Sequence, residues 1–272
     1  MKSSSSPPAH AFDIAGFLQG GRRPEATRLV VCAGDSITRG RSSANWVDML
    51  QGRLSHEGYQ CVNAGIDGGL AWNVLQRIDE VIRCQPDVVT LQVGTNDINA
   101  TLGAWQEKTY RRQQHIPQTP TLDWYTECVG GILARLQSQA SARLAVLDIP
   151  MIGEDLTSDI NRRVDSYNQA LRRVAAAHAV ECLPLHDTLA SLLPAGHHPP
   201  PYRGRFGPMI RASLSHNILH RSWDRISAAN GLAVLTDHVH LNDRAAACVA
   251  DLVADFITRT DQWSSRSLPS RS

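Results

Sequence analysis

Short apolar runs alternate with helix-like segments along most of this chain, and this alternation limits the possible folds more than any other feature. Five runs are rich in β-forming residues and lie at about 29–33, 60–65, 87–93, 143–149 and 181–185. Between them, apolar residues recur every three or four positions, as on one face of an amphipathic helix. Strands that alternate with helices pair in parallel through right-handed crossovers, so we predict an α/β fold.

The predicted organisation is a single domain with two long loops. The 272 residues suit one α/β domain, and a hydrophobic content of 42% is ample for its core. We expect a doubly wound, flavodoxin-like three-layer sandwich whose five parallel strands have the order 2-1-3-4-5. The predicted parts are an N-terminal tail and short helix at 1–26, the domain at 27–260 with long loops at 98–121 and 193–231, and a flexible C-terminal tail at 261–272.

The composition argues against several classes of protein. A formal net charge of +1 does not indicate nucleic acid or an anionic membrane as the main partner. No apolar run reaches the roughly 18 residues of a membrane span, and the polar N-terminus lacks the apolar segment of a signal peptide. The six cysteines have no C-x-x-C spacing, so we expect neither a zinc site nor a disulfide framework. We therefore predict a cytoplasmic protein without a metal or another cofactor.

Polar turns follow the predicted strands at the edge where open parallel sheets bind ligands. Such sheets bind beyond the carboxyl ends of their strands, near the point where the strand order reverses. In the order 2-1-3-4-5, Ser36 after the first strand faces Asn96 after the third, and Gly65 ends the second strand close by. A serine in this position also commonly caps the helix that follows, so the serine alone does not establish a catalytic site.

Four short blocks resemble those of the SGNH/GDSL hydrolases. They are Gly-Asp-Ser-Ile at 34–37, Asn-Ala-Gly-Ile-Asp-Gly at 63–68, Gly-Thr-Asn-Asp at 94–97 and Asp-His-Val-His at 237–240. Each block alone is weak, but all four occur in the family order and at plausible strand ends. The resemblance spans about residues 29–256 and implies a serine esterase with a flavodoxin-like sheet.

The resemblance implies a role for each matching residue. Ser36 would be the nucleophile, His240 its general base and Asp237 the carboxylate that orients the base. The backbone N–H of Ser36, that of Gly65 and the side-chain amide of Asn96 would form the oxyanion hole. His238 is a competing base or a metal partner of His240, but only His240 matches the family pattern. We expect His238 to be an exposed or hydrogen-bonded loop residue.

Other residues have both a functional and a structural interpretation. Asp35 is a substrate-binding or acidic candidate, but Asp also serves as a turn or cap residue. Asn63 braces the oxyanion loop in one interpretation and ends a strand in the other. Trp105 and Trp223 line an acyl or sugar pocket, or they pack in the core or in loops. The pair His197-His198 suggests a metal site, although no third ligand has matching spacing.

The leading functional prediction is a serine ester hydrolase that works through an acyl-enzyme. Its small-molecule substrate is predicted to be soluble and to carry a short or acetyl acyl group, because no apolar entrance helix is evident. An acyltransferase, a lysophospholipase or a thioesterase would use the same acyl-enzyme. A non-catalytic flavodoxin-like binding module is the alternative from another class, but no Gly-rich phosphate loop follows the first strand. Such a module would not need Asp237 and His240.

Overall fold

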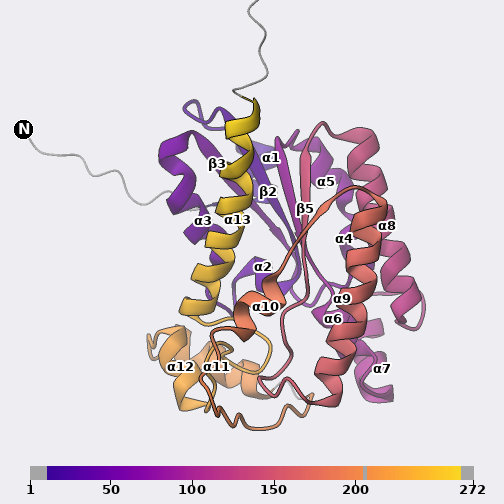
Figure 1. Ribbon diagram of the computed structural model, residues 1–272, viewed down its shortest axis with the longest axis vertical. Coiled ribbons are helices and arrows are strands. Elements are labelled where there is room, and N and C mark those ends of the chain that lie inside the picture. Colours follow the sequence, from indigo (N-terminus) through magenta and orange to yellow (C-terminus); the bar gives the residue numbers. More distant parts are fainter. Residues whose placement is uncertain (1–10, 205–206, 265–272) are drawn as a thin grey trace, which may run out of the picture.

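The computed structural model describes residues 11–204 and 207–264, and its centre is a parallel sheet with helices on both faces (Figure 1). The predicted tail at 1–10 and the C-terminal end of the predicted tail at 265–272 lie outside the described residues. The described part of the chain contains no helix that is long and apolar enough to cross a membrane.

Six strands form the sheet in the order β1-β3-β2-β4-β5-β6, and every neighbouring pair is parallel. Their bounds are Phe12–Asp13 (β1), Arg28–Gly34 (β2), Tyr59–Gly65 (β3), Val88–Gln92 (β4), Arg143–Leu147 (β5) and Glu181–Leu183 (β6). The five predicted strands are β2 to β6, and their predicted order is confirmed. The prediction of five strands missed β1, because two residues at the edge of a sheet have no periodic pattern that could reveal them.

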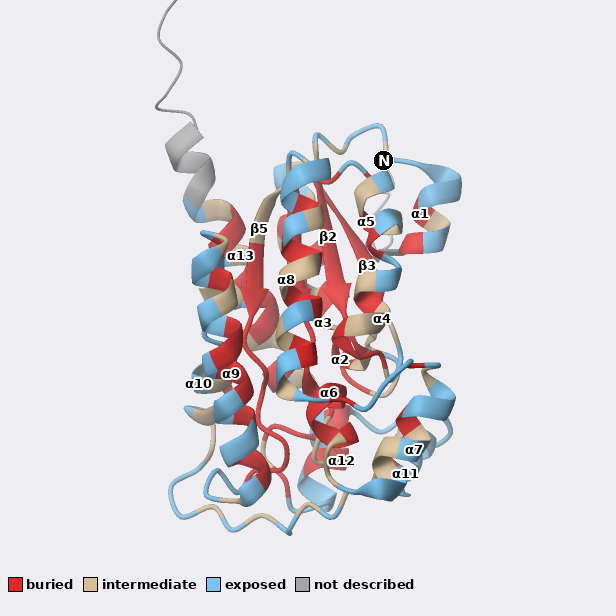
Figure 2. Cartoon of the chain, turned by 90° about the vertical axis from the view of Figure 1, so that its right-hand side faces the viewer, coloured by how far each residue is buried: buried red, intermediate tan, exposed pale blue. Residues whose placement is uncertain are grey.

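The residues of β2 alternate between two hydrophobic cores, because successive side chains of a strand point to opposite faces. Leu29, Val31 and Ala33 pack in one core, whereas Val30 and Cys32 pack in the other. Both faces of the strand are therefore covered, which explains its apolar sequence. Figure 2 shows the strands as a buried layer between the helices.

Two sets of helices cover the two faces of the sheet. The first core is closed by α1 (Ile14–Gly20), α4 (Ala71–Gln76), α5 (Ile78–Arg83), α8 (Leu122–Gln139) and α9 (Asp159–Ala177). The second core is closed by α3 (Trp46–Leu54), α10 (Leu185–Ala190), α12 (Trp223–Ala229) and α13 (Asp243–Ser264). The short helices α2 (Ser36–Arg39) and α6 (Thr95–Ala100) begin at the carboxyl ends of β2 and β4, and the 3-10 turn η1 (Ser55–Glu57) precedes β3.

The two segments that we predicted as long loops contain helices. The segment 98–121 includes α7 (Ala104–Gln113), and the segment 193–231 includes α11 (Gly207–Asn217) and α12. Tyr110 is the only buried residue of α7, and Ala212 is the only one of α11. The helix α7 has no apolar stripe by which it could be found in the sequence, whereas the spaced apolar residues Ile210 and Leu214 of α11 are exposed. The helix α13 also continues beyond the predicted domain end at residue 260.

Candidate active site

Ser36 lies at the sharp turn between β2 and α2. A Cβ atom at Gly34, the last residue of β2, would collide with the carbonyl oxygen of Gln92, so glycine allows the turn to pack tightly. The side chain of Asp35 then caps α2 by accepting a hydrogen bond from the Ile37 N–H at 2.9 Å. Ser36 is thereby the first residue of the helix, and its own N–H has no partner within the helix.

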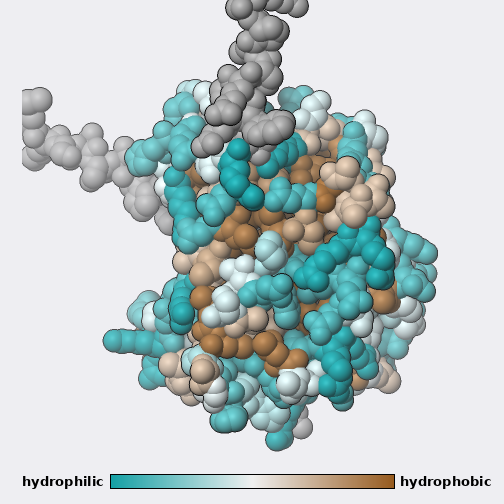
Figure 3. Space-filling view, viewed as in Figure 1, coloured by the Kyte–Doolittle hydropathy of each residue, from teal (hydrophilic) through white to brown (hydrophobic). Residues whose placement is uncertain are grey.

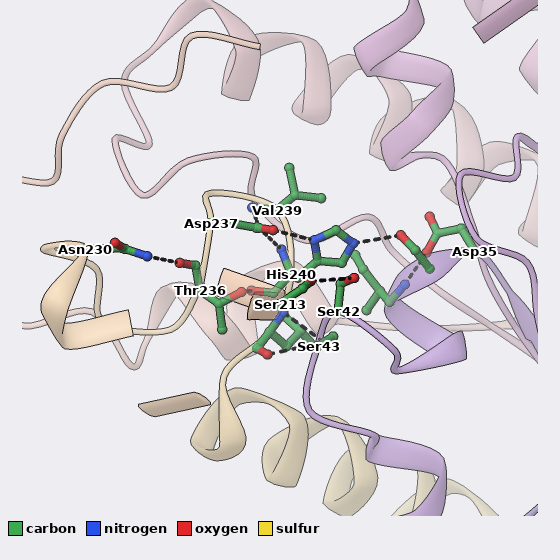
Figure 4. A network of polar contacts seen from close by, with 12 residues as sticks. Asp35, Ser42, Ser43, Ser213, Asn230, Thr236, Asp237, Val239 and His240 are labelled. Atoms are coloured by element: carbon green, nitrogen blue, oxygen red, sulfur yellow. Dashed lines mark hydrogen bonds and ion pairs between the residues drawn. The ribbon is translucent and has the colours of Figure 1, made fainter. Parts of the chain in front are cut away.

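His240 brings the predicted catalytic residues together. Its Nε2 lies 3.0 Å from Ser36 Oγ, and its Nδ1 lies 2.8 Å from Asp237 Oδ2. The other carboxylate oxygen of Asp237 accepts the backbone N–H groups of His240 at 2.9 Å and of Val239 at 3.0 Å. Figure 4 shows the imidazole ring directed at Asp237 within residues 236–241, which we call the base loop. One carboxylate therefore fixes both the ring and the backbone that carries it.

The electrostatics of the base loop suit a general base. His240 is 5% exposed and Asp237 is 4% exposed. Burial disfavours a charged imidazole, but the charge and the hydrogen bond of Asp237 outweigh it and raise the pKa of His240 above its usual value. Burial also disfavours the carboxylate, yet the charge of His240 and the hydrogen bonds from the loop lower the pKa of Asp237. The site thus combines an ionised carboxylate with an imidazole that readily accepts a proton.

Glu154 anchors the base loop from the segment that follows β5. Its buried carboxylate accepts the three consecutive backbone N–H groups of residues 233–235, at 2.8 to 3.0 Å. His197 Nε2 contacts the same carboxylate at 2.6 Å. The neighbouring Gly153 donates its N–H to the carbonyl oxygen of His238 at 2.7 Å. The chain on both sides of Asp237 is therefore held by residues 153 and 154.

His238 lies in the base loop beside Tyr202. Its backbone has a φ of +78°, which is unusual for a residue other than glycine. The ring is half-buried, lies 5.8 Å from the Tyr202 ring, and its Nδ1 atom has no partner among the described residues. Burial lowers the pKa of His238. Because Ser36 contacts His240, the family pattern and the geometry select the same histidine.

Asn96 reaches the site from α6, and two neighbours hold its amide. Asn96 Nδ2 donates to the carbonyl oxygen of Gly69 at 3.0 Å, and Asn96 Oδ1 accepts from the Tyr110 hydroxyl at 2.9 Å. The Gly69 carbonyl oxygen can only accept a hydrogen bond, so the end of the Asn96 amide that faces it must be the nitrogen. An amide nitrogen carries two hydrogens, and the second one remains for a group in the pocket that Asn96 lines.

The prediction that Gly65 donates to an oxyanion is wrong. Its N–H is used by Asn63 Oδ1 at 3.0 Å, and Gly65 does not line the pocket. The glycine is needed for packing instead, because a Cβ would collide with the backbone nitrogen of Arg39. Gly68 lies in the same sequence block and does line the pocket, with a φ of +70°. Among the described residues its N–H has no acceptor.

These groups open into one pocket with a volume of about 530 Å³. Ser36, Gly68, Asn96, Asp237 and His240 line it together. Much of the remaining wall lies in or beside two helices that the sequence pattern did not reveal. Gln106, Tyr110 and Gln113 belong to α7 with Leu102 and Gln114 beside it, and Met209 and Ile210 belong to α11 with Tyr202 and Gly204 before it.

Four further residues predicted to bind substrate lie outside this pocket lining. Asp35 is fully buried as the cap of α2, and its burial raises its pKa to about 7. Asn63 braces the turn, because its Nδ2 donates to the Thr38 carbonyl oxygen at 2.7 Å. Trp223 is buried at the start of α12, and Trp105 is 57% exposed on the outside of α7. For Asp35 and Asn63 the structural interpretation therefore describes what the side chains do.

The sequence-based prediction missed three residues that shape the site. Gly68 was quoted in a motif, but Gly65 was chosen because it ends the strand. Tyr110 is the one buried residue of α7, so no apolar stripe marks it. Glu154 precedes the base loop by more than 80 residues, and only the fold brings its carboxylate to residues 233–235. Of the predicted pair His197-His198, His197 contacts Glu154. No group of three metal-ligating side chains occurs in the described residues.

Comparisons with known proteins agree with this fold. The profile of the GDSL-like lipase/acylhydrolase family matches residues 32–248. An acetyl xylan esterase named AlAXEase is similar in structure, with 20% identity, a TM-score of 0.58, and coverage of 84% of this chain and 99% of that chain. The acetylxylan esterase Axe2 from Geobacillus stearothermophilus has 16% identity, a TM-score of 0.62, and coverage of 87% and 97%. No curated protein sequence matches.

The matched segment covers most of the chain and includes all four motifs. The chain therefore belongs to the GDSL-like lipase/acylhydrolase family, and it is an SGNH-type esterase. The two solved structures share the fold, which is the predicted flavodoxin-like sheet flanked by helices.

Proposed function

We propose that this esterase hydrolyses carboxylic esters through an acyl-enzyme formed on Ser36. The supporting observation is the continuous contact from Ser36 Oγ to His240 and from His240 to Asp237. A serine hydroxyl becomes a good nucleophile when a neighbouring imidazole takes its proton. Ser36 Oγ attacks the ester carbonyl carbon while His240 Nε2 accepts that proton. His240 then returns it to the departing alcohol oxygen as the ester C–O bond breaks, and water releases the acid by the reverse sequence.

The negative charge that develops on the carbonyl oxygen needs fixed hydrogen-bond donors. We assign this role to the second Nδ2 hydrogen of Asn96 and to the backbone N–H groups of Ser36 and Gly68. A single donor of this kind typically contributes about 3–4 kcal/mol of transition-state stabilisation. The loop that carries Gly68 is held in place, because Gly69 accepts from Asn96 and Asp67 accepts from Gln114 Nε2 at 3.2 Å.

The proposed acyl group is short, with acetyl as the reference case. Polar side chains, among them Asn99, Gln106 and Gln113, line part of the pocket, and they can bind the alcohol part of an ester. Two solved structures of the same fold are named acetyl xylan esterases. The further expectation of a small soluble alcohol assumed that no apolar helix lies at the entrance, and α11 contradicts that assumption. The predicted cytoplasmic location stays a prediction.

A fluorophosphonate probe tests the nucleophile directly. We expect stoichiometric labelling of the native protein and none of Ser36→Ala at matched thermal stability. Labelling that survives in Ser36→Ala would remove the nucleophile assignment. A series of p-nitrophenyl acetate, butyrate and octanoate tests the acyl group, and we expect kcat/KM to fall with chain length. A preference for octanoate would contradict the short acyl group and leave the nucleophile untouched.

A further inference from the structure

The entrance of the pocket carries an unusual concentration of exposed apolar side chains. Within the described part of the chain, four of the seven exposed large apolar residues lie in ten consecutive positions: Ile210 (53% exposed), Leu214 (51%), Ile218 (66%) and Leu219 (59%). Figure 3 shows, on another face of the molecule, that apolar areas interrupt the polar surface only in places. We call residues 207–221 the mouth segment. Exposed apolar patches of this kind mark interaction sites.

The helix α11 is turned with its apolar stripe away from the protein. Ala212 is buried beneath it, and Ser213 Oγ donates to Ser42 Oγ at 3.1 Å beside the pocket. Ile210, Leu214 and Ile218 recur every four residues, so they form one stripe on the other side. A surface helix normally buries such a stripe. The stripe therefore has a partner outside this domain or lies at an apolar–water boundary.

The positively charged residues around this stripe favour an anionic partner. The whole chain has 27 basic and 26 acidic residues, but residues 188–223 contain four arginines and no acidic residue. Arg203, Arg211 and Arg221 of this stretch are exposed. On the opposite side of the pocket, α7 presents Trp105 and three basic side chains at positions 108, 111 and 112, of which Arg111 pairs with Glu107 at 3.8 Å. A second copy of this chain would bring like charges together, which opposes self-association through this face.

We propose that the mouth segment and the outer face of α7 dock onto an anionic lipid surface. A helix with an apolar stripe flanked by arginine lies in a lipid interface with its apolar side chains inserted and its charges at the headgroups. Ile210 belongs both to the stripe and to the pocket lining, so docking places the pocket opening at the interface. The proposal concerns binding and goes beyond ester hydrolysis, because it holds equally for a catalytically inactive protein.

Sedimentation with vesicles tests the proposal on the full chain carrying Ser36→Ala. We expect binding to vesicles of phosphatidylcholine with 30 mol% phosphatidylglycerol, at least about tenfold weaker binding to pure phosphatidylcholine, and release by high salt. L214S/I218S should weaken binding at least about tenfold by removing inserted side chains. R211Q/R221Q should weaken it through charge. The matched controls L156S and R83Q alter an exposed leucine elsewhere and an exposed arginine that ends α5, before the amino end of β4.

Three outcomes would overturn the proposal. The first is no binding to the anionic vesicles, and the second is binding that L214S/I218S leaves unchanged. The third is a native dimer, measured by analytical ultracentrifugation, that L214S/I218S dissociates, because the face would then be a contact between two copies. Fluorophosphonate labelling of the native protein and of L214S/I218S is measured in parallel. Its loss in both would contradict the proposed function while the vesicle result stands.

Discussion

The base loop and the mouth segment lie within 40 residues of each other in the stretch between β6 and α13, yet they are built on opposite principles. In the base loop, Asp237 and His240 are buried and bonded to each other, and Glu154 holds the preceding backbone. In the mouth segment, apolar side chains such as Leu214 and Ile218 face solvent. A proton transfer needs atoms fixed within a few tenths of an ångström, whereas contact with a surface needs only exposed area and charge.

Replacing His240 should cause the largest effect and shows whether the base loop carries catalysis. We expect His240→Ala to lower kcat on p-nitrophenyl acetate about 10⁴-fold or more, because the serine loses its base. His238→Ala is the control in the same loop, and its kcat should stay within about tenfold of the native value. A larger loss for His238→Ala than for His240→Ala would reverse the assignment of the base.

The helix α7, on the other side of the pocket, combines a fixed and an exposed aromatic residue. Tyr110 is buried and Trp105 is exposed. Asn96→Ala should lower kcat about 10²–10³-fold through loss of an oxyanion donor. Tyr110→Phe removes the hydroxyl that donates to Asn96 Oδ1, and we expect kcat to fall about tenfold with KM nearly unchanged. Trp105→Ala, on the outer face, should leave both constants for a soluble ester unchanged. A rise in KM alone for Tyr110→Phe would mean that Tyr110 binds substrate.

Glu154→Gln tests how strongly the base loop depends on its anchor. The substitution removes the carboxylate that accepts three backbone N–H groups, so we expect the free energy of unfolding to fall by about 1–3 kcal/mol. Urea denaturation measures this change. The exposed Glu127 of α8 provides the control, because Glu127→Gln should change stability by less than about 0.5 kcal/mol. Equal stability of the two variants would show that the anchor is dispensable.

The pH dependence of activity reports the charge coupling in the base loop. The pKa of His240 is raised above its usual value, and the base must be neutral, so kcat/KM should rise with pH through a midpoint above 6.5. Asp237→Asn should move that midpoint to lower pH and lower the maximum.

The stability of the folded protein depends on pH through the same two residues. The contribution of charged His240 to the free energy of unfolding is present at low pH and is lost as pH rises through the raised pKa. The contribution of Asp237 is lost as pH falls through its lowered pKa. A native midpoint below 6.5 would contradict the coupling.

The mouth segment should give the smallest effect on a soluble substrate. L214S/I218S replaces two exposed side chains that do not line the pocket, so the free energy of unfolding should change by less than about 1 kcal/mol. We also expect kcat/KM on p-nitrophenyl acetate within about twofold of the native value. A marked loss of either quantity would mean that the stripe packs within the protein and that the contrast between the two regions is false.

The sequence by itself determined the parallel sheet and pointed to the polar groups that meet at its carboxyl edge. Apolar runs such as 29–33 suit a strand covered by helices on both faces, and their alternation with helices makes the strands parallel. The motifs around Ser36, Asn96 and His240 are local, so the residues that carry them can be read directly. The resemblance to a family extended that local information to Asp237.

Only the tertiary structure decided which backbone amide faces the pocket, what holds the base loop and what surrounds the entrance. Gly65 and Gly68 are both glycines of one motif, and the difference is that the N–H of Gly65 is already used by Asn63. Glu154 meets residues 233–235 through contacts between segments that are remote in sequence. The apolar stripe of α11 has the spacing of a helix face that packs in a core. It is exposed because the rest of the protein does not cover that side of the helix. Periodicity reports that a face is apolar, but neighbouring elements determine whether that face is buried.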